Sequence, residues 1–208
     1  MANETRQPLV IACAALTADL RAVLTADGLD DLVEVHYLHA NLHNTPQHIV
    51  GEIRPLLEQA RADDRPVFVA YADCGTGGLL DALLAEHPGV GRLPGAHCYE
   101  FFAGSRVFAA LQEAELGTFY LTDFLAKHFD ALVWSGLGLD RAPELRDMYF
   151  SHYTRLVLLA QTDDDVITEA ATVAAKRLGL RFERMLVGRS GMQAPVREWA
   201  VSIGKAAA

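Results

Sequence analysis

Three cysteines, each at the end of a short apolar segment, are the residues of this chain best suited to chemistry. Cys13 follows PLVIA, Cys74 follows PVFVAYAD and Cys98 follows LPGAH. In an open parallel sheet the strand ends gather at one edge, where ligands bind, so the three thiols are expected to meet in one pocket. His97 adds an imidazole beside Cys98. Thiolates and imidazole suit zinc or iron, and these four residues are the predicted metal ligands.

The segment YADCGTGGL, residues 71–79, predicts a strand that enters a glycine-rich turn and then a helix. Backbone N–H groups at a helix start favour anions and stabilise a thiolate. We therefore predict catalytic roles for Asp73 and Cys74 and ligand contacts from Gly75, Thr76 and Gly77. The alternative is a tight turn with an incidental buried cysteine. The segment matches neither a P-loop nor the GxGxxG pattern, so no nucleotide is predicted.

PGAHCYEFFAG, residues 94–104, is the second segment with ligand-type side chains. A loop or a helix cap can direct both His97 and Cys98 inward, although a regular element cannot. Glu100 adds a carboxylate, predicted to act as an acid or base or to support the metal ligands. In the alternative interpretation this segment is only the aromatic start of a core helix.

Four further polar residues are second-rank candidates for the walls of a ligand pocket. His43 stands just before a predicted helix start, and Asp123 follows a predicted strand. Tyr149 and His152 are three positions apart, on one face of a helix. In the alternative interpretation, His43 lies in a solvent-exposed histidine-rich loop, and Tyr149 and His152 lie at a solvent-exposed helix end.

Predicted strands and helices alternate along the whole chain. This alternation is typical of an α/β fold, and we expect a single layered domain over residues 1–208, with a largely parallel sheet and helices on both faces. The first strand is expected to be central, and the tail after about residue 188 to be a terminal helix or disordered. The expected strands are 8–13, 32–38, 66–71, 91–93, 117–122, 155–160 and 180–187. The expected helices span residues 17–26, 46–62, 79–86, 99–111, 123–134, 143–152 and 163–178.

Composition narrows the classes of partner. Of 208 residues 51% are hydrophobic, which suits one compact core. The formal charge of −9, from 18 basic and 27 acidic residues, and the lack of a basic stripe argue against nucleic acid. The start MANETRQ is polar and no apolar run approaches ~20 residues, so we expect a cytoplasmic protein without a membrane partner. Apolar helices near the end are compatible with a homo-oligomer.

Over nearly its whole length the chain resembles the uncharacterised bacterial and archaeal family named domain of unknown function 1638. The segments that carry the resemblance are IACAAL, LHNTP, YADCGTGGL, LPGAHCYEFFAG, GTFYLTDF, ELRDMYFSHYTRLVLLAQTDD and RLGL. Cys13, Cys74, His97 and Cys98 match cysteine and histidine positions of that family, in which many members carry one more residue between the last two. Members are often encoded near corrinoid-dependent methyltransferases, so the resemblance implies one-carbon metabolism on methylamines or betaines, with a corrinoid protein or methyltransferase as partner.

Three hypotheses follow for the function. The first is a metal-assisted methyl or thiol transferase, or an accessory factor, in which a Cys/His zinc or iron centre activates a small ligand. The second is a module that binds a corrinoid or haem without turnover, although no Asp-x-His-x-x-Gly segment of a classical corrinoid carrier follows the first strand. The third is a metal-free enzyme in which Cys74 is the nucleophile and His97 its base.

Overall fold

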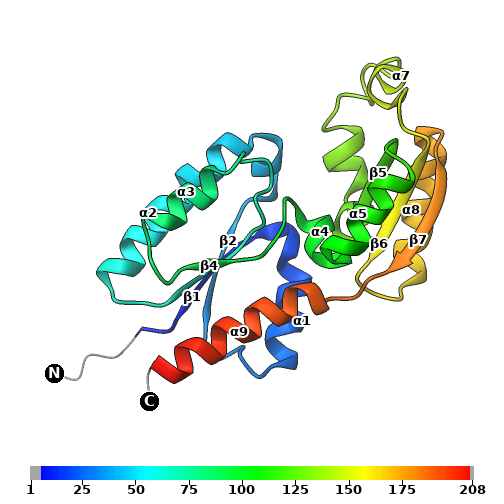
Figure 1. The fold of residues 1–208 in the computed structure, drawn as a ribbon. Helices are drawn as coiled ribbons and strands as arrows, with labels where there is room; N and C mark the ends of the chain where they lie inside the picture. Colours follow the sequence, from blue (N-terminus) through cyan, green and yellow to red (C-terminus); the bar gives the residue numbers. More distant parts are fainter. Residues whose placement is uncertain (1–5, 207–208) are drawn as a thin grey trace. The chain divides into compact units, whose positions relative to one another are not determined.

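A computed structural model describes residues 6–206 and groups them into two compact units, each with its own parallel sheet (Figure 1). Unit 1 comprises the chain up to Phe101 together with the chain from Arg189 onward, and unit 2 runs from Phe102 to Gly188. The predicted α/β class, with parallel pairing and helices around the strands, is confirmed. The hydrophobic pattern did not predict that the strands divide between two sheets.

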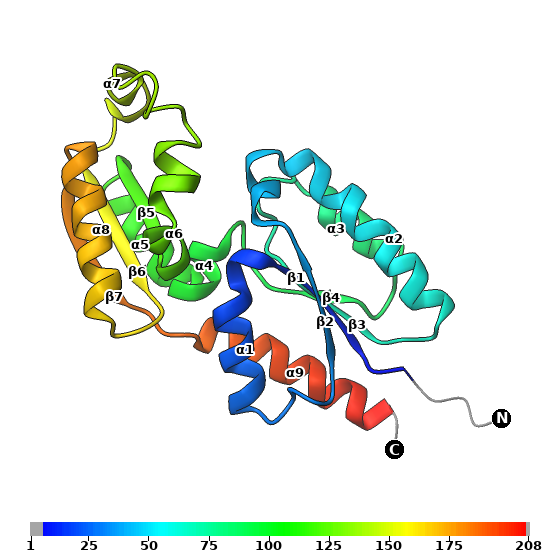
Figure 2. The same ribbon diagram turned by 180° about the vertical axis from the view of Figure 1, so that it is seen from behind.

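The sheet of unit 1 has the strand order β2-β1-β3-β4, and every neighbouring pair is parallel. The first strand is interior, as expected, and all five of its residues are buried, which explains its unbroken apolar run. Helices α2 and α3 lie on one side of this sheet and α1 and α9 on the other (Figures 1 and 2). The strands are β1 Leu9–Cys13, β2 Glu34–Leu38, β3 Val67–Ala70 and β4 Gly91–Arg92. The helices are α1 Thr17–Ala26, α2 Ile49–Ala62, α3 Leu79–Ala85, α4 Cys98–Ala103, which crosses into unit 2, and α9 Ser190–Ala206.

The tail of the chain returns to unit 1 as helix α9. Its start is fixed by Arg189, whose Nε donates to a carboxylate oxygen of Asp19 at 2.6 Å. Further along, the Gln193 amide donates to Asp27 at 2.8 Å, and the Trp199 ring lies 5.6 Å from that of Phe68 in β3. Of the two alternatives for this tail, the described residues adopt the helical one.

Unit 2 contains the parallel sheet β5-β6-β7. One face packs its apolar side chains against α6 and α8 in a continuous core. On the other face, the Phe108 ring of α5 lies 5.1 Å from the Tyr120 ring of β5. The strands are β5 Thr118–Thr122, β6 Arg155–Ala160 and β7 Arg181–Leu186. The helices are α5 Ser105–Ala114, α6 Asp123–Lys127, α7 Leu145–Phe150 and α8 Asp165–Leu178.

Four helix predictions differ most clearly from the structure. The helix expected over 143–152 is α7, which ends at Phe150, so His152 lies beyond it and does not share a helical face with Tyr149 as predicted. The helix expected over 99–111 is interrupted at Gly104, whose φ of 82° is a left-handed conformation, so α4 and α5 are separate. The helix expected from Pro46 begins as a 3₁₀ turn, Thr45 makes no side-chain cap, and α2 starts at Ile49. The helix expected over 123–134 is α6 followed by a π-helical turn at 130–134. Within residues 6–206 we find no helix with the length and apolar character that crossing a bilayer requires.

Candidate functional site

The candidate site lies at the carboxyl edge of the unit 1 sheet, because four parallel strands end there. Strand β1 ends at Cys13, β2 leads into the turn that carries His43, β3 leads into Tyr71 and Cys74, and β4 leads to Cys98. We call Cys13, Cys74 and Cys98 the thiol cluster. All three thiols are free of disulfides.

Cys13 is the most deeply buried member of the cluster, with 2% of its surface exposed. Its Sγ accepts a hydrogen bond from the Ala15 N–H at 3.4 Å and so caps the 3₁₀ turn 14–16 that follows β1. The same Sγ lies 3.6 Å from Nδ1 of His43. Burial raises the pKa of the Cys13 thiol, while the Ala15 N–H and Tyr71 partly offset this effect.

His43 is the histidine whose ring contacts a thiol of the cluster directly. Its Nδ1 also lies 3.2 Å from the Ala40 carbonyl oxygen, and its ring stacks on Tyr71 with 6.1 Å between centroids and 15° between planes. The residue as a whole is exposed, but its packed ring loses water, and this desolvation lowers the pKa of His43. The imidazole is therefore mainly neutral at pH 7, which is the form that binds metals.

Tyr71 is a member of the site that the sequence patterns did not single out. It is fully buried directly after β3, and its hydroxyl has no nitrogen or oxygen partner among residues 6–206. Burial raises the pKa of Tyr71 strongly, and negative charge on Cys13 adds to the rise because the hydroxyl lies beside that thiol. A buried aromatic residue immediately before a glycine-rich turn is the signal that would have drawn attention to it.

Cys74 occupies a turn that is fixed by backbone hydrogen bonds. Its N–H donates to the Ala96 carbonyl at 2.8 Å and the Asp73 N–H to the Gly95 carbonyl at 3.1 Å, which ties this turn to the segment before Cys98. The φ of Cys74 is 51°, a left-handed conformation that is rare outside glycine. Burial first, and negative charge on Cys13 second, raise the pKa of Cys74 to about 12.

The glycine-rich turn is capped from within by Asp73. Its carboxylate accepts hydrogen bonds from the Thr76 hydroxyl at 2.6 Å and from the N–H groups of Gly77 and Gly78 at 3.0 and 2.8 Å. Burial opposes ionisation of Asp73, but these donors outweigh it and hold the pKa of that carboxyl below its usual range. An anionic ligand group would therefore compete with Asp73 for the N–H groups that were predicted to bind it.

The segment from Gly95 to Glu100 places the third thiol. Glu100 Oε2 accepts the Ala96 N–H at 2.8 Å, and the His97 carbonyl accepts the Glu100 N–H at 3.0 Å, so the carboxylate caps the start of α4. The His97 ring packs against that of Tyr99, 5.8 Å between centroids. Burial, followed by negative charge on Cys74 and Cys13, raises the pKa of Cys98.

The three thiols follow strands that end at one edge of the sheet, and negative charge on one member of the cluster raises the pKa of another. Their ionisation is unfavourable without a nearby cation, since each thiolate is desolvated and repels the others. Among residues 6–206, no three His, Cys, Asp or Glu side chains already stand in a geometry that holds a metal ion. A metal would therefore have to draw the thiols together.

The raised pKa predicts that metal-free Cys74 reacts slowly with alkylating agents. At pH 7.5 we expect carboxamidomethylation by iodoacetamide about 100-fold slower than that of free cysteine, because the thiolate is scarce and its higher intrinsic nucleophilicity recovers only part of the loss. The rate should rise about tenfold per pH unit as pH approaches the pKa of Cys74, about 12. Mass spectrometry of chelator-treated protein locates the label. Labelling of Cys74 at or above the rate of free cysteine would favour the metal-free nucleophile instead.

The remaining predicted pocket residues belong to unit 2. Asp123 is buried, and its carboxylate accepts hydrogen bonds from the Gln161 N–H at 3.1 Å and from the N–H and hydroxyl of Thr162 at 2.9 and 2.6 Å. These contacts join the ends of β5 and β6.

Tyr149 and His152 are exposed, and the His152 carbonyl lies so close to Gly117 that a Cβ there would be 2.5 Å away.

Comparison with known proteins identifies the family of this chain. The family model described as protein of unknown function (DUF1638) matches residues 37–194. No curated protein and no solved structure matches the chain with significance.

Proposed function

Because this chain belongs to the DUF1638 family, whose description assigns no activity, we propose from its own residues that the thiol cluster and His43 bind one thiophilic metal ion, zinc or iron. The observation that carries this proposal is that three free thiols follow strands ending at one sheet edge, with an imidazole nitrogen 3.6 Å from Cys13 Sγ. Sulfur and imidazole nitrogen are the ligand types of zinc and iron–sulfur sites. A divalent cation also stabilises the thiolates, whose formation is opposed mainly by burial.

Differences in exposure give the ligands different roles. Cys13 is buried, Cys74 and Cys98 are half-buried, and His43 is exposed. We assign the three thiolates to hold the ion and His43 to occupy the position that an incoming ligand displaces. A site with one exchangeable position is the arrangement that catalytic metal centres use.

This arrangement supports transfer of a methyl group to a thiol, in line with the one-carbon role that the family resemblance implies. The three thiolates and His43 would hold the ion, which would supply Lewis-acid activation of a small incoming thiol, and the neutral His43 imidazole would accept that thiol's proton. The thiolate sulfur then attacks the methyl carbon of a donor. As the new sulfur–carbon bond forms, the bond from methyl to the donor breaks and its electron pair leaves with the donor.

In this proposal Asp73 and Glu100 are positioning residues. Asp73 fixes the turn that carries Cys74, and Glu100 caps the helix that begins at Cys98. The acid–base roles predicted for both carboxylates stay predictions, as do a metal bond from His97 and a corrinoid protein or methyltransferase as partner.

Cobalt substitution tests the proposal through two matched histidine variants. Added Co²⁺ should give intense thiolate-to-cobalt charge-transfer absorption in the wild-type protein. The His43→Ala protein should keep this absorption but bind Co²⁺ about 10- to 100-fold more weakly, since the thiolates remain and the imidazole is lost. His48→Ala, which alters an exposed histidine on the same segment, should bind as wild type does.

Two results would contradict the proposal. The first is Co²⁺ bound without thiolate charge transfer, which would place the metal elsewhere. The second is purified protein that carries a haem or corrinoid spectrum, which would favour the cofactor-binding module.

A further inference from the structure

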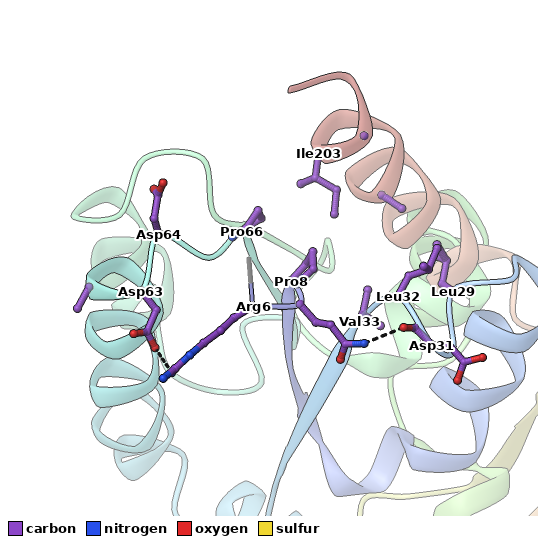
Figure 3. Close-up of a pocket in the computed structure, with 14 residues that line it drawn as sticks. Arg6, Pro8, Leu29, Asp31, Leu32, Val33, Asp63, Asp64, Pro66 and Ile203 are labelled. Carbon is purple, nitrogen blue, oxygen red and sulfur yellow. Dashed lines mark hydrogen bonds and ion pairs between the residues drawn. The ribbon is translucent and has the colours of Figure 1, made fainter. Parts of the chain in front are cut away.

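Unit 1 contains a second candidate site at the opposite edge of its sheet, where β1, β2 and β3 begin. A cavity of about 940 Å³ opens there, next to the last turns of α9 (Figure 3). This volume is in the range of small-molecule sites, roughly 300–1,000 Å³. Because the thiol cluster lies at the carboxyl edge of the same sheet, this cavity is separate from the proposed metal centre.

The walls of the cavity are mostly apolar. Pro8 and Pro66 come from the starts of β1 and β3, Leu29 and Leu32 from the loop after α1, and Ile203 from α9 (Figure 3). Leu32 is 59% exposed and so offers apolar surface to a ligand. The cavity therefore suits a ligand with an apolar body.

The polar residues of the cavity have an excess of negative charge. Among the side chains that the structure describes, Asp31, Asp63 and Asp64 line it together with one cationic side chain, Arg6. Arg6 is bound to Asp63 at 2.6 Å. Within residues 6–204, whose side chains the structure describes, Asp31 and Asp64 take part in no ion pair.

Backbone dipoles add to this negative potential. Helices α1, α2 and α9 all run toward this edge and end at Ala26, Ala62 and Ala206. The carboxyl end of a helix carries about half a negative charge from its unsatisfied carbonyl groups. Carboxylates and helix ends thus both favour a cation beside the apolar walls.

From this combination we infer that the cavity binds a small organic cation with an apolar body, such as an alkylated or aromatic amine. The apolar walls take the body, and the negative potential of the lining carboxylates favours the charge. The inference does not depend on the metal centre, because the two sites share no residue.

A titration with benzyltrimethylammonium, monitored through backbone amide NMR shifts of the full chain, tests this inference. Shifts are expected around Leu32 and Ile203, and phenylacetate, of similar size but opposite charge, should bind at least about tenfold more weakly. Added salt should weaken binding of the cation because the rim is open to solvent. No shift at these amides, or equal binding of phenylacetate, would overturn the inference.

Two double variants separate the effect of the cavity carboxylates from that of the net charge of the protein. Asp31→Asn with Asp64→Asn should weaken cation binding about tenfold, since two carboxylates are neutralised. Asn tolerates the left-handed backbone at position 64, where φ is 52°, so the fold should persist. Glu52→Gln with Glu58→Gln removes the same charge from exposed positions of α2 and should leave affinity unchanged. An equal loss of affinity in both double variants would mean that only the net charge of the protein matters, which would contradict a cation site at this cavity. Cys74→Ser should bind the cation normally even if it loses metal.

Discussion

Cys74→Ser protein should lose stoichiometric metal binding. Removal of one thiolate takes away a charged ligand from a desolvated site, and we expect affinity for zinc to fall at least ~100-fold. Ser is close to Cys in size, so the turn between β3 and α3 should persist. Competition with a chromophoric chelator measures the loss, and Cys13→Ser and Cys98→Ser should behave alike.

Thermal unfolding provides the control for Cys74→Ser. With chelator present, wild-type and variant proteins should unfold at similar temperatures, because none then has a metal. Excess zinc at about 100 times its Kd should stabilise the wild type by about 2.7 kcal/mol and leave the variant nearly unchanged. A variant that gains as much stability from zinc as the wild type would exclude Cys74 as a ligand.

Asp123→Ala should destabilise unit 2 by about 3 kcal/mol without any change in metal binding. The substitution leaves the N–H groups of Gln161 and Thr162 without their charged acceptor in a buried place, and each such group costs about 1–3 kcal/mol. Asp123→Asn keeps an acceptor oxygen and should cost less. Chemical denaturation followed by circular dichroism measures the difference.

The same variant distinguishes the two interpretations of Asp123. The sequence pattern predicted a pocket residue, whereas the contacts describe a residue that joins two strand ends. Asp123→Ala protein of unchanged stability that had lost metal or ligand binding would restore the pocket interpretation.

The fold class was accessible from the sequence because its strands are short apolar runs separated by amphipathic helices. The interior place of β1 could be predicted because the first strand of such folds is normally central, and in the structure all five of its residues are buried. The split into two sheets was not accessible, since strand pairing depends on contacts between distant segments and not on local pattern. The break at Gly104 was missed because an isolated glycine within an apolar pattern does not by itself mark the end of a helix.

The elements that carry the three thiols could be predicted, but the detailed contacts of the site could not. Strand ends marked by cysteine indicate one edge of a parallel sheet, and the structure places all three there. The stacking of His43 on Tyr71 depends on how the turn after β2 folds over β3. Likewise, the carboxylate of Asp73 fills its own turn, a local contact that competes with the predicted anion site.

Metal content is the measurement that tests the central claim most directly. The full chain would be purified without a histidine tag and without chelator, and its zinc and iron determined by elemental analysis beside Cys74→Ser and Cys98→Ser proteins. The proposal predicts about one metal ion per chain in the wild type and essentially none in either variant. Well-folded wild-type protein that contains no metal and takes up none when zinc or iron(II) is added would contradict it.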